Sequence, residues 1–300
     1  MKNPFTVAAI QMRCVEDRES NLTSAEQLVL EAAKSGGQVI CLPEIFHGLY
    51  FCQEETLDPF REAEPIPGPI VERMQRLAGE LEVVIIVPIF ERRSEGVYHN
   101  SAAVIDADGT LLGTYRKMHI PDDPGFYEKF YFAPGDLGFR SWKTRYGTIG
   151  VCICWDQWFP EAARLTAMTG AHVLFYPTAI GWHPGTDEEL KSAQHESWQI
   201  SMRGHAVANG CYVVASNRVG HEAPEGGPGI DFWGRSFISD PAGRLVQTFT
   251  DEEDSILLHE VDPSVIERQR IEWPFFRDRR IDAYSGLTKR FLDEETSGAS

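Results

Sequence analysis

The chain has 300 residues, 42% of them hydrophobic and 24% charged, so it can bury a large core as one sizeable domain or as two small ones. Its net charge of −17 at pH 7 argues against binding to nucleic acid or to an anionic membrane, because an acidic surface repels phosphate groups. The apolar runs are too short to cross a bilayer and the N-terminus has no signal-like apolar core, which together predict a cytoplasmic protein.

Short apolar runs alternate with amphipathic stretches along both halves of the chain. Apolar residues at helical spacing predict helices over residues 21–33, 70–81, 160–168 and 190–208. Apolar runs bounded by turn residues predict buried strands over residues 6–10, 39–42, 83–90, 148–153, 173–176 and 212–216. Alternation of this kind is typical of an α/β fold.

Each half of this pattern ends in a predicted hairpin. The first spans residues 101–115, where Asp108-Gly109 supplies the positive φ of a tight turn, and the second spans residues 236–249. The two hairpin sequences resemble each other, which suggests pseudo-equivalent halves whose sheets pack face to face. No long linker divides the chain, so we expect a single domain over residues 1–292 and a disordered tail over residues 293–300.

Cysteine usage gives no sign of disulfides or of a metal site. The six cysteines lack the spacing of a small disulfide-bonded domain, so free thiols in a reducing cytoplasm are expected. Cys152 and Cys154 could offer a metal two ligands, but no second Cys or His pair lies at ligand spacing. We therefore expect no bound metal.

Residues 148–161 contain the first candidate for chemistry. A predicted buried strand leads to Cys154, and a helix begins near Pro160 after a short turn. Ligands bind at the C-terminal edge of such strands, and a helix N-terminus there favours a thiolate and a developing oxyanion. Cys154 is thus a candidate nucleophile. The alternative is a small buried apolar residue, which is the commonest fate of a lone cysteine.

Three charged residues complete the candidate set. Glu44 closely follows the predicted strand 39–42 and would serve as a general base if a partly dry pocket raised its pKa. Lys117 closes the first hairpin and could stabilise an oxyanion. Glu128 lies among aromatic residues and could orient Lys117 or bind polar atoms of a substrate. Taken singly, Glu44 and Lys117 also fit ordinary solvated positions, and only the combination points to a site.

At these residues the sequence resembles the carbon–nitrogen hydrolase, or nitrilase, superfamily. Members carry a Glu in Leu-Pro-Glu, a Lys in Tyr-Arg-Lys-x-His and a Cys in Ile-Cys-(Trp/Tyr/Asn)-Asp. Glu44, Lys117 and Cys154 match these positions in order, and Glu128 matches an additional glutamate. The resemblance covers nearly the whole chain. It implies a four-layer α-β-β-α sandwich, a homo-oligomer, and neither a metal nor an organic cofactor.

The resemblance also implies roles for the matching residues. Cys154 attacks the carbonyl carbon, Glu44 carries protons, and Lys117 binds the oxyanion together with the backbone N–H of Trp155. Within the superfamily the sequence is most similar to enzymes that hydrolyse N-carbamoylputrescine, with matching stretches at residues 50–54, 115–122, 128–132, 153–164, 175–181, 215–218 and 276–280. This implies a small carbamoyl amine or amide as the substrate.

The substrate-binding residues are a further prediction. A cationic amine at the far end of a substrate needs an acid or an aromatic face. The candidates for substrate contact are Tyr50, Asp122, Asp123, Trp155 and Ala179. The two aspartates equally fit a role as caps of the Pro-Asp-Asp-Pro-Gly turn. Residues 182–195 and 209–211 depart from the closest group, and loops of this kind shape a substrate pocket.

Two alternatives stay open. One is a related substrate, as in β-ureidopropionases, N-carbamoyl amino-acid hydrolases, aliphatic amidases or nitrilases. Trp-Asp-Gln-Trp after Cys154 supplies no cation for a substrate carboxylate, which disfavours the carbamoyl amino acids. The other alternative is a non-catalytic scaffold that keeps the fold, and the intact set of Glu44, Lys117 and Cys154 argues against it.

Overall fold

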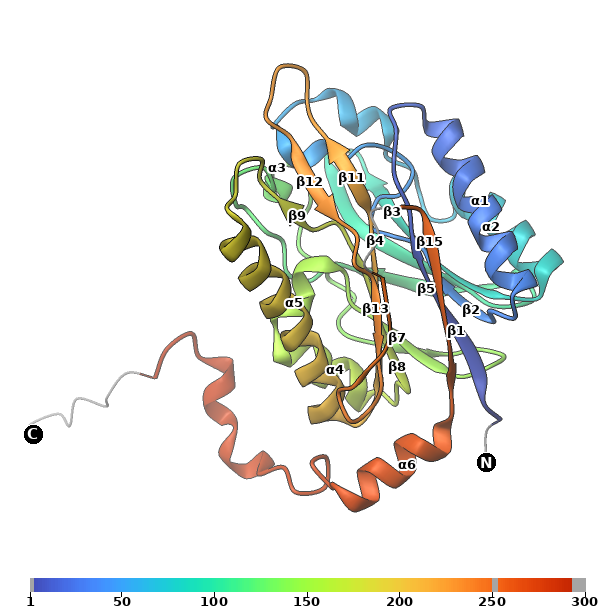
Figure 1. Ribbon diagram of the computed structural model, residues 1–300, viewed down its shortest axis with the longest axis vertical. Helices are drawn as coiled ribbons and strands as arrows, with labels where there is room; N and C mark the ends of the chain where they lie inside the picture. Colours follow the sequence, from blue (N-terminus) through green and yellow to red (C-terminus); the bar gives the residue numbers. More distant parts are fainter. Residues whose placement is uncertain (1–2, 250–252, 293–300) are drawn as a thin grey trace, which may run out of the picture.

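In the computed structural model, which describes residues 3–249 and 253–292, two six-stranded sheets pack against each other and helices cover their outer faces (Figure 1). The first sheet has the strand order β15-β1-β2-β3-β4-β5. Its strands are β1 (Phe5–Gln11), β2 (Val39–Cys41), β3 (Val84–Ser94), β4 (Val97–Ile105), β5 (Leu111–Arg116) and β15 (Ser255–Val261). The predicted tail, residues 293–300, lies outside the described residues.

The second sheet has the order β14-β13-β10-β8-β7-β6. Its strands are β6 (Ser141–Lys143), β7 (Thr148–Val151), β8 (Val173–Thr178), β10 (Tyr212–Asn217), β13 (Phe237–Ser239) and β14 (Leu245–Thr248). A small third sheet is formed by β9 (Gly181–Trp182), β11 (Val219–Glu222) and β12 (Ile230–Trp233). The α-helices are α1 (Arg18–Lys34), α2 (Pro69–Leu81), α3 (Glu128–Tyr131), α4 (Pro160–Met168), α5 (Glu188–Asn209) and α6 (Pro263–Glu272).

The two large sheets have the same connectivity. In the first, β1, β2 and β3 are parallel neighbours, followed by antiparallel β4 and β5. In the second, β7, β8 and β10 are parallel neighbours, followed by antiparallel β13 and β14. Each sheet also has one antiparallel outer strand, β15 beside β1 and β6 beside β7. This equivalence confirms the pseudo-equivalent halves that the repeated hairpin predicted.

Alternating side chains of the strands build the layers. Val7 and Ala9 of β1 belong to the core between the sheets, whereas Ala8 and Ile10 belong to the core beneath α1 and α2. On β10, Val214 faces the core between the sheets, and its neighbours on the strand pack beneath α4 and α5. Burial of a valine or isoleucine side chain at these positions contributes about 1.5–3 kcal/mol. The result is the predicted four-layer α-β-β-α sandwich, a rigid platform for the loops at the strand ends.

Some differences from the sequence prediction lie at strand ends, and others are short elements that were not predicted, namely β6, β9, β11, β12 and α3. β7 stops at Val151 rather than at residue 153, because the Asp156 carboxylate accepts the backbone N–H of Ile153 at 2.9 Å and the chain turns into a 3₁₀ helix. β3 and β4 extend beyond the prediction and meet at a turn in which Gly96 has a φ of 74°. β15 and α6 were not predicted. β15 is mostly half-buried, so it lacks the apolar run that marks the central strands.

Two further expectations concern thiols and membranes. All six cysteines are buried free thiols, as the cysteine spacing predicted. Within residues 3–249 and 253–292, none of the helices has the length and apolar character needed to span a bilayer.

Candidate active site

Four side chains with catalytic potential lie where strands end. Glu44 follows β2, Lys117 directly follows β5, Cys154 opens the 3₁₀ helix η3 (Cys154–Trp158) after β7, and Glu128 begins α3. β2 pairs in parallel with β3, and β4 is antiparallel to both β3 and β5, so β5 runs in the same direction as β2. Glu44 and Lys117 therefore lie at the same edge of the sheet. All four side chains are buried, and Cys154 interacts electrostatically with the other three. The structure thus brings the predicted set together.

Lys117 forms the centre of a buried charge cluster. Its Nζ lies 2.8 Å from Oε1 of Glu44 and 2.8 and 2.7 Å from the two carboxylate oxygens of Glu128. Burial by itself would lower the pKa of Lys117, but Glu128 and Glu44 outweigh it and hold that pKa well above its ordinary value. Lys117 is therefore a fixed cation that can donate hydrogen bonds and cannot act as a base.

The two carboxylates are held in different ways. Glu128 has both oxygens occupied, because it accepts from Lys117 at each and from the hydroxyl of Tyr50 at 2.7 Å. Glu44 uses only Oε1, which accepts from Lys117 and, at 2.6 Å, from Nδ2 of Asn100 on β4. Among the residues that the structure describes, none donates a hydrogen bond to the buried Oε2 of Glu44. This oxygen is therefore the part of the carboxylate that can accept a proton from a group in the pocket.

Cys154 occupies a strained turn. Its φ is 41°, in the left-handed region that non-glycine residues rarely adopt, and such strain is concentrated at functional sites. Its Sγ lies 3.7 Å from the carbonyl oxygen of Ala179, just after β8. Burial raises the pKa of the Cys154 thiol well above its ordinary value, and repulsion from Glu44 adds to the rise more than Lys117 reduces it.

This pocket opposes the thiolate that a helix N-terminus by itself would favour. The expected help from a helix N-terminus does not overcome the loss of solvation in a pocket that also holds two carboxylates. Cys154 is a neutral thiol near neutral pH, so nucleophilic attack requires a base to remove its proton. The free oxygen of Glu44 is suited to that task.

Asp156 connects the cysteine turn to the strand that carries Lys117. Its Oδ2 accepts from the backbone N–H of Ile153 at 2.9 Å and from the hydroxyl of Tyr115 at 2.7 Å. Its Oδ1 accepts from the backbone N–H of His119 at 3.0 Å and lies 2.7 Å from Nδ1 of the same residue. Tyr115 and His119 flank Lys117, so one buried carboxylate sets the distance between nucleophile and cation. His119 also stacks on Phe159, so it serves here in packing and hydrogen bonding.

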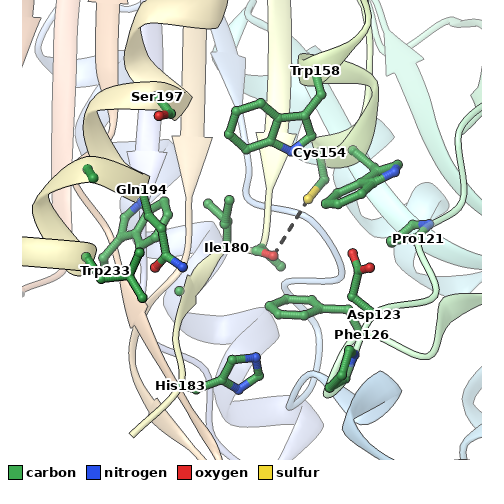
Figure 2. Close-up of a pocket in the computed structure, with 16 residues that line it drawn as sticks. Pro121, Asp123, Phe126, Cys154, Trp158, Ile180, His183, Gln194, Ser197 and Trp233 are labelled. Carbon is green, nitrogen blue, oxygen red and sulfur yellow. Dashed lines mark hydrogen bonds between the residues drawn. The ribbon is translucent and has the colours of Figure 1, made fainter. Parts of the chain in front are cut away.

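A cavity of about 390 Å³ leads to Cys154. Figure 2 shows Sγ of Cys154 directed into it, with the carboxylate of Asp123 on another wall. Aromatic and apolar side chains dominate its surface. Its lining residues are Pro121, Asp123, Pro124, Phe126, Cys154, Trp155, Trp158, Ala179, Ile180, Gly181, His183, Leu190, Ala193, Gln194, Ser197 and Trp233.

The predicted substrate contacts divide into two groups. Asp123, Trp155 and Ala179 line the cavity, which is where a substrate would be held. Asp122 is exposed and is not among the lining residues. Tyr50 is 1% exposed and also absent from the lining, because its hydroxyl is engaged behind the cavity with Glu128. The structure thus offers Asp123 rather than Asp122 to a substrate, and gives Tyr50 a supporting position.

Sequence reasoning did not single out several residues of the cavity wall. Phe126, Trp158 and Trp233 add aromatic faces, and His183 and Gln194 add polar groups (Figure 2). A signal for two of them existed, because His183 and Gln194 fall in the stretch 182–195, which the sequence analysis expected to shape the substrate pocket. The other departing stretch, residues 209–211, lies beyond the cavity at the end of α5.

The residues that the structure describes contain no group of three His, Cys, Asp or Glu side chains arranged to hold a metal ion. Cys152, the one cysteine close to Cys154 in sequence, packs instead against Thr166 of α4, with Sγ 3.4 Å from its hydroxyl oxygen. The arrangement of a thiol, a base and a fixed cation can support nucleophilic attack on a carbonyl.

Activity is expected to rise with pH through about 7. Burial raises the pKa of the Glu128 carboxyl to about 7, while Lys117 opposes the rise and Glu44 adds to it. Protonation removes the charge that orients Lys117, so kcat/KM should fall up to about tenfold for each pH unit below about 6 and level off above about 8. Rate profiles of the wild type and of Glu128→Gln measure this. The expectation is contradicted if the wild type shows no fall of kcat/KM at acid pH, or if Glu128→Gln shows the same fall.

Comparisons with known proteins agree with this geometry. A family model described as carbon-nitrogen hydrolase matches residues 6–271. N-carbamoylputrescine amidase from Oryza sativa subsp. japonica is 50% identical over 296 residues, which cover 97% of this chain and 96% of the relative. A citrullinase from Francisella tularensis subsp. tularensis is 42% identical over 286 residues, covering 95% of this chain and 98% of the relative.

A solved structure shows the same fold. The crystal structure of a carbon-nitrogen hydrolase from Helicobacter pylori G27 aligns with a TM-score of 0.93 and 42% sequence identity. The alignment covers 97% of this chain and all of the other. This chain thus shares its overall fold with a solved carbon-nitrogen hydrolase.

Proposed function

This chain belongs to the carbon–nitrogen hydrolase family and is an enzyme, and from that premise we propose that it hydrolyses N-carbamoylputrescine to putrescine, carbon dioxide and ammonia. The observation that carries the proposal is the cavity next to Cys154. It combines one carboxylate, Asp123, with the faces of Phe126, Trp155 and Trp158, and no lysine or arginine of the described chain lines it. Such a wall suits a ureido group attached to an alkyl ammonium. Relatives that are about half identical over nearly their full length carry the name of this activity.

In the first half of the proposed reaction, Glu44 removes the thiol proton and Sγ of Cys154 forms a bond to the ureido carbon. The carbonyl oxygen becomes an oxyanion. The three N–H groups of Lys117 face three carboxylate oxygens, one of Glu44 and two of Glu128. One of its two hydrogen bonds to Glu128 is therefore exchanged for a bond to the oxyanion, which the backbone N–H of Trp155 at the start of η3 also binds. Each donor of this kind is worth on the order of a hundredfold in rate. Glu44 then returns the proton to nitrogen as the C–N bond breaks and ammonia leaves.

In the second half, water hydrolyses the thiocarbamate on Cys154. Glu44 takes a proton from the water as its oxygen attacks the same carbon, and the C–S bond breaks to restore the thiol. The released carbamate loses carbon dioxide and leaves putrescine. Glu128 does not touch the reacting atoms in this scheme. It holds Lys117, and Tyr50 in turn holds Glu128, so both are positioning residues.

A second candidate substrate is citrulline, because a citrullinase is 42% identical to this chain. Citrulline has the same ureido end but adds a carboxylate at the far end, which calls for a cation or for neutral donors. His183 and Gln194 are the lining residues that could supply donors. We favour the carbamoyl amine, because Asp123 would repel a carboxylate in the same cavity.

An ammonia-release assay with a matched set of substrates tests the proposal. The set contains N-carbamoylputrescine, N-carbamoylbutylamine, citrulline, N-carbamoyl-β-alanine and a simple nitrile, each with the wild type and with Asp123→Asn. We expect kcat/KM to be highest for N-carbamoylputrescine. Asp123→Asn should lower it by about tenfold or more, mainly through KM, because a charge-assisted hydrogen bond contributes about 1.5–3 kcal/mol.

N-carbamoylbutylamine is the control, because it lacks the ammonium but keeps the chain length. Its kcat/KM should be the same in the wild type and in Asp123→Asn to within about threefold. If Asp123→Asn lowers kcat/KM equally for both substrates, Asp123 does not recognise the amine. A preference of the wild type for citrulline or N-carbamoyl-β-alanine would replace the proposed substrate while keeping the reaction.

The homo-oligomeric state and the cytoplasmic location remain proposals from sequence. Support for self-association comes from large apolar side chains near the C-terminus that a second copy could cover. Trp273, Ile281, Leu287 and Phe291 are between 60% and 76% exposed.

A further inference from the structure

A fully buried arginine contacts the loop that carries Glu44. Arg218 directly follows β10 and has no exposed surface. Its Nη2 donates to the backbone carbonyls of Ile45 at 2.7 Å, Gly48 at 3.0 Å and Glu44 at 3.3 Å. A side chain from the second half of the chain thus holds three carbonyls of a loop from the first half.

The other end of this guanidinium is held by Glu222, the last residue of β11. Nη1 of Arg218 donates to both carboxylate oxygens of Glu222, each at 2.8 Å. Oε2 of Glu222 also accepts the backbone N–H of Tyr50 at 2.6 Å, and Tyr50 is the residue whose hydroxyl holds Glu128. The Arg218–Glu222 pair therefore hydrogen-bonds to the loop next to Glu44 and again at Tyr50. Neither Arg218 nor Glu222 lines the cavity.

The loop is strained at the residue after Glu44. Ile45 has a φ of 48°, a conformation that β-branched residues rarely adopt. Such a conformation persists only where the surrounding contacts over-determine it. The bond from Arg218 to the Ile45 carbonyl is one of these contacts, and the bond from the Cys14 thiol to the Phe46 carbonyl at 3.3 Å is another. Loss of the arginine would allow the backbone to relax and would move the carboxylate that precedes it.

We propose that Arg218 and Glu222 are positioning residues for catalysis, which hold the Glu44 carboxylate and the Tyr50 hydroxyl in the geometry that proton transfer from Cys154 requires. This inference rests on the proposed function, in which Glu44 is the base. A buried ion pair is weak evidence for a stabilising role, because well-packed apolar replacements are often as stable. Here the hydrogen bonds of the pair go to the one loop that carries both Glu44 and Tyr50.

Arg218→Lys keeps the charge but cannot reach all of these acceptors with one ammonium. We expect kcat to fall about 10- to 100-fold with KM within about threefold, because a small displacement of a catalytic group has effects of this size. Alkylation of Cys154 by iodoacetamide at pH 7 should slow in parallel, since the thiol depends on the same base. Glu222→Gln should show a smaller loss, because its amide oxygen can still accept from Tyr50.

Val29→Ala is the matched control for destabilisation. Val29 is buried on α1 in the core beneath α1 and α2, and its truncation should lower Tm without removing any hydrogen bond to the loop. Slower turnover and alkylation in Arg218→Lys, with both unchanged in Val29→Ala, supports positioning. The positioning role is overturned if turnover and alkylation in Arg218→Lys stay within about threefold of the wild type. It is also overturned if a control variant with the same Tm as Arg218→Lys loses as much turnover and alkylation.

If Arg218→Lys does not fold, Glu222→Gln decides the question: slower alkylation supports the proposal, and unchanged alkylation and kcat overturn it. Glu44→Gln separates this inference from the proposed function. Full turnover in Glu44→Gln would remove Glu44 as the base and with it the proposed function. An inactive Glu44→Gln beside a normal Arg218→Lys would remove the positioning role alone.

Discussion

Replacing Cys154 with alanine is expected to lower kcat by at least about a thousandfold while the fold stays intact, because the reaction loses the atom that bonds to the substrate carbon. Cys154 belongs to the core between the sheets and contacts the Ala179 carbonyl at 3.7 Å, but its replacement by alanine removes only the sulfur atom, so the loss of stability should be small beside the loss of activity. Ammonia release measures the first effect, and thermal unfolding followed by circular dichroism measures the second. Alanine leaves the strain of this turn unchanged, because the strain lies in the backbone φ of 41°.

Cys152→Ala is the matched control for this prediction. Cys152 is also fully buried and lies two residues earlier, but it faces Thr166 and the core beneath α4 and α5. We expect Cys152→Ala to lose stability and to keep kcat within about threefold of the wild type. Mass spectrometry after iodoacetamide treatment should find the first label on Cys154. More than about a tenth of wild-type activity in Cys154→Ala, or a first label on another cysteine, would contradict the assignment.

The fold was predictable where local pattern and tertiary burial agree. The central parallel strands are buried on both faces, so β2, β8 and β10 appear as apolar runs in the sequence. The repeated hairpin gave the pseudo-twofold relation. β15 could not be predicted in this way, because it is an edge strand with mixed exposure and its pairing with β1 joins distant parts of the chain. The end of β7 depended on one side chain, Asp156, which competes with the ladder for the Ile153 N–H.

The sequence predicts which residues form the site, but it does not predict the protonation state of Cys154. Motif order places Glu44, Lys117, Glu128 and Cys154 in one site, because the C-terminal ends of the strands converge. The protonation of Cys154 depends on burial and on two neighbouring carboxylates, which are properties of the assembled pocket. The roles of Tyr50 and Asp123 were open for the same reason. Only the structure shows that one stands behind Glu128 and the other on the cavity wall.

Replacing Lys117 with methionine is expected to have the second large effect, on stability as well as on catalysis. Methionine has a similar length but leaves Glu44 and Glu128 facing each other without their shared cation. Removing one partner of a buried ion pair costs about 3–5 kcal/mol, and kcat should fall by at least about a hundredfold with the loss of the oxyanion donor. Urea unfolding and ammonia release measure the two effects.

The double variant Lys117→Met/Glu128→Gln separates the effect on stability from the effect on catalysis. The charges of Lys117, Glu44 and Glu128 sum to −1 in the wild type, to −2 in the single variant and again to −1 in the double variant when both glutamates are ionised. The double variant should therefore regain much of the lost stability and none of the activity. A double variant as unstable as the single one would mean that packing, rather than charge, explains the loss.

The pH dependence of unfolding tests independently whether unpaired carboxylates cause the stability loss in Lys117→Met. Burial already raises the pKa of Glu128 in the folded wild type to about 7, above the usual 4.5, so the native state binds this proton more tightly than the unfolded chain does. Stability from this group is fully present below the unfolded pKa and is lost as pH rises through the folded pKa. Without Lys117 the folded pKa rises further, so the deficit of Lys117→Met relative to wild type should shrink as pH falls toward about 7 and change little below it, where Glu128 is protonated in both folded proteins. A deficit that is constant above about pH 7, or that grows as pH falls, would show that unpaired carboxylates are not its cause.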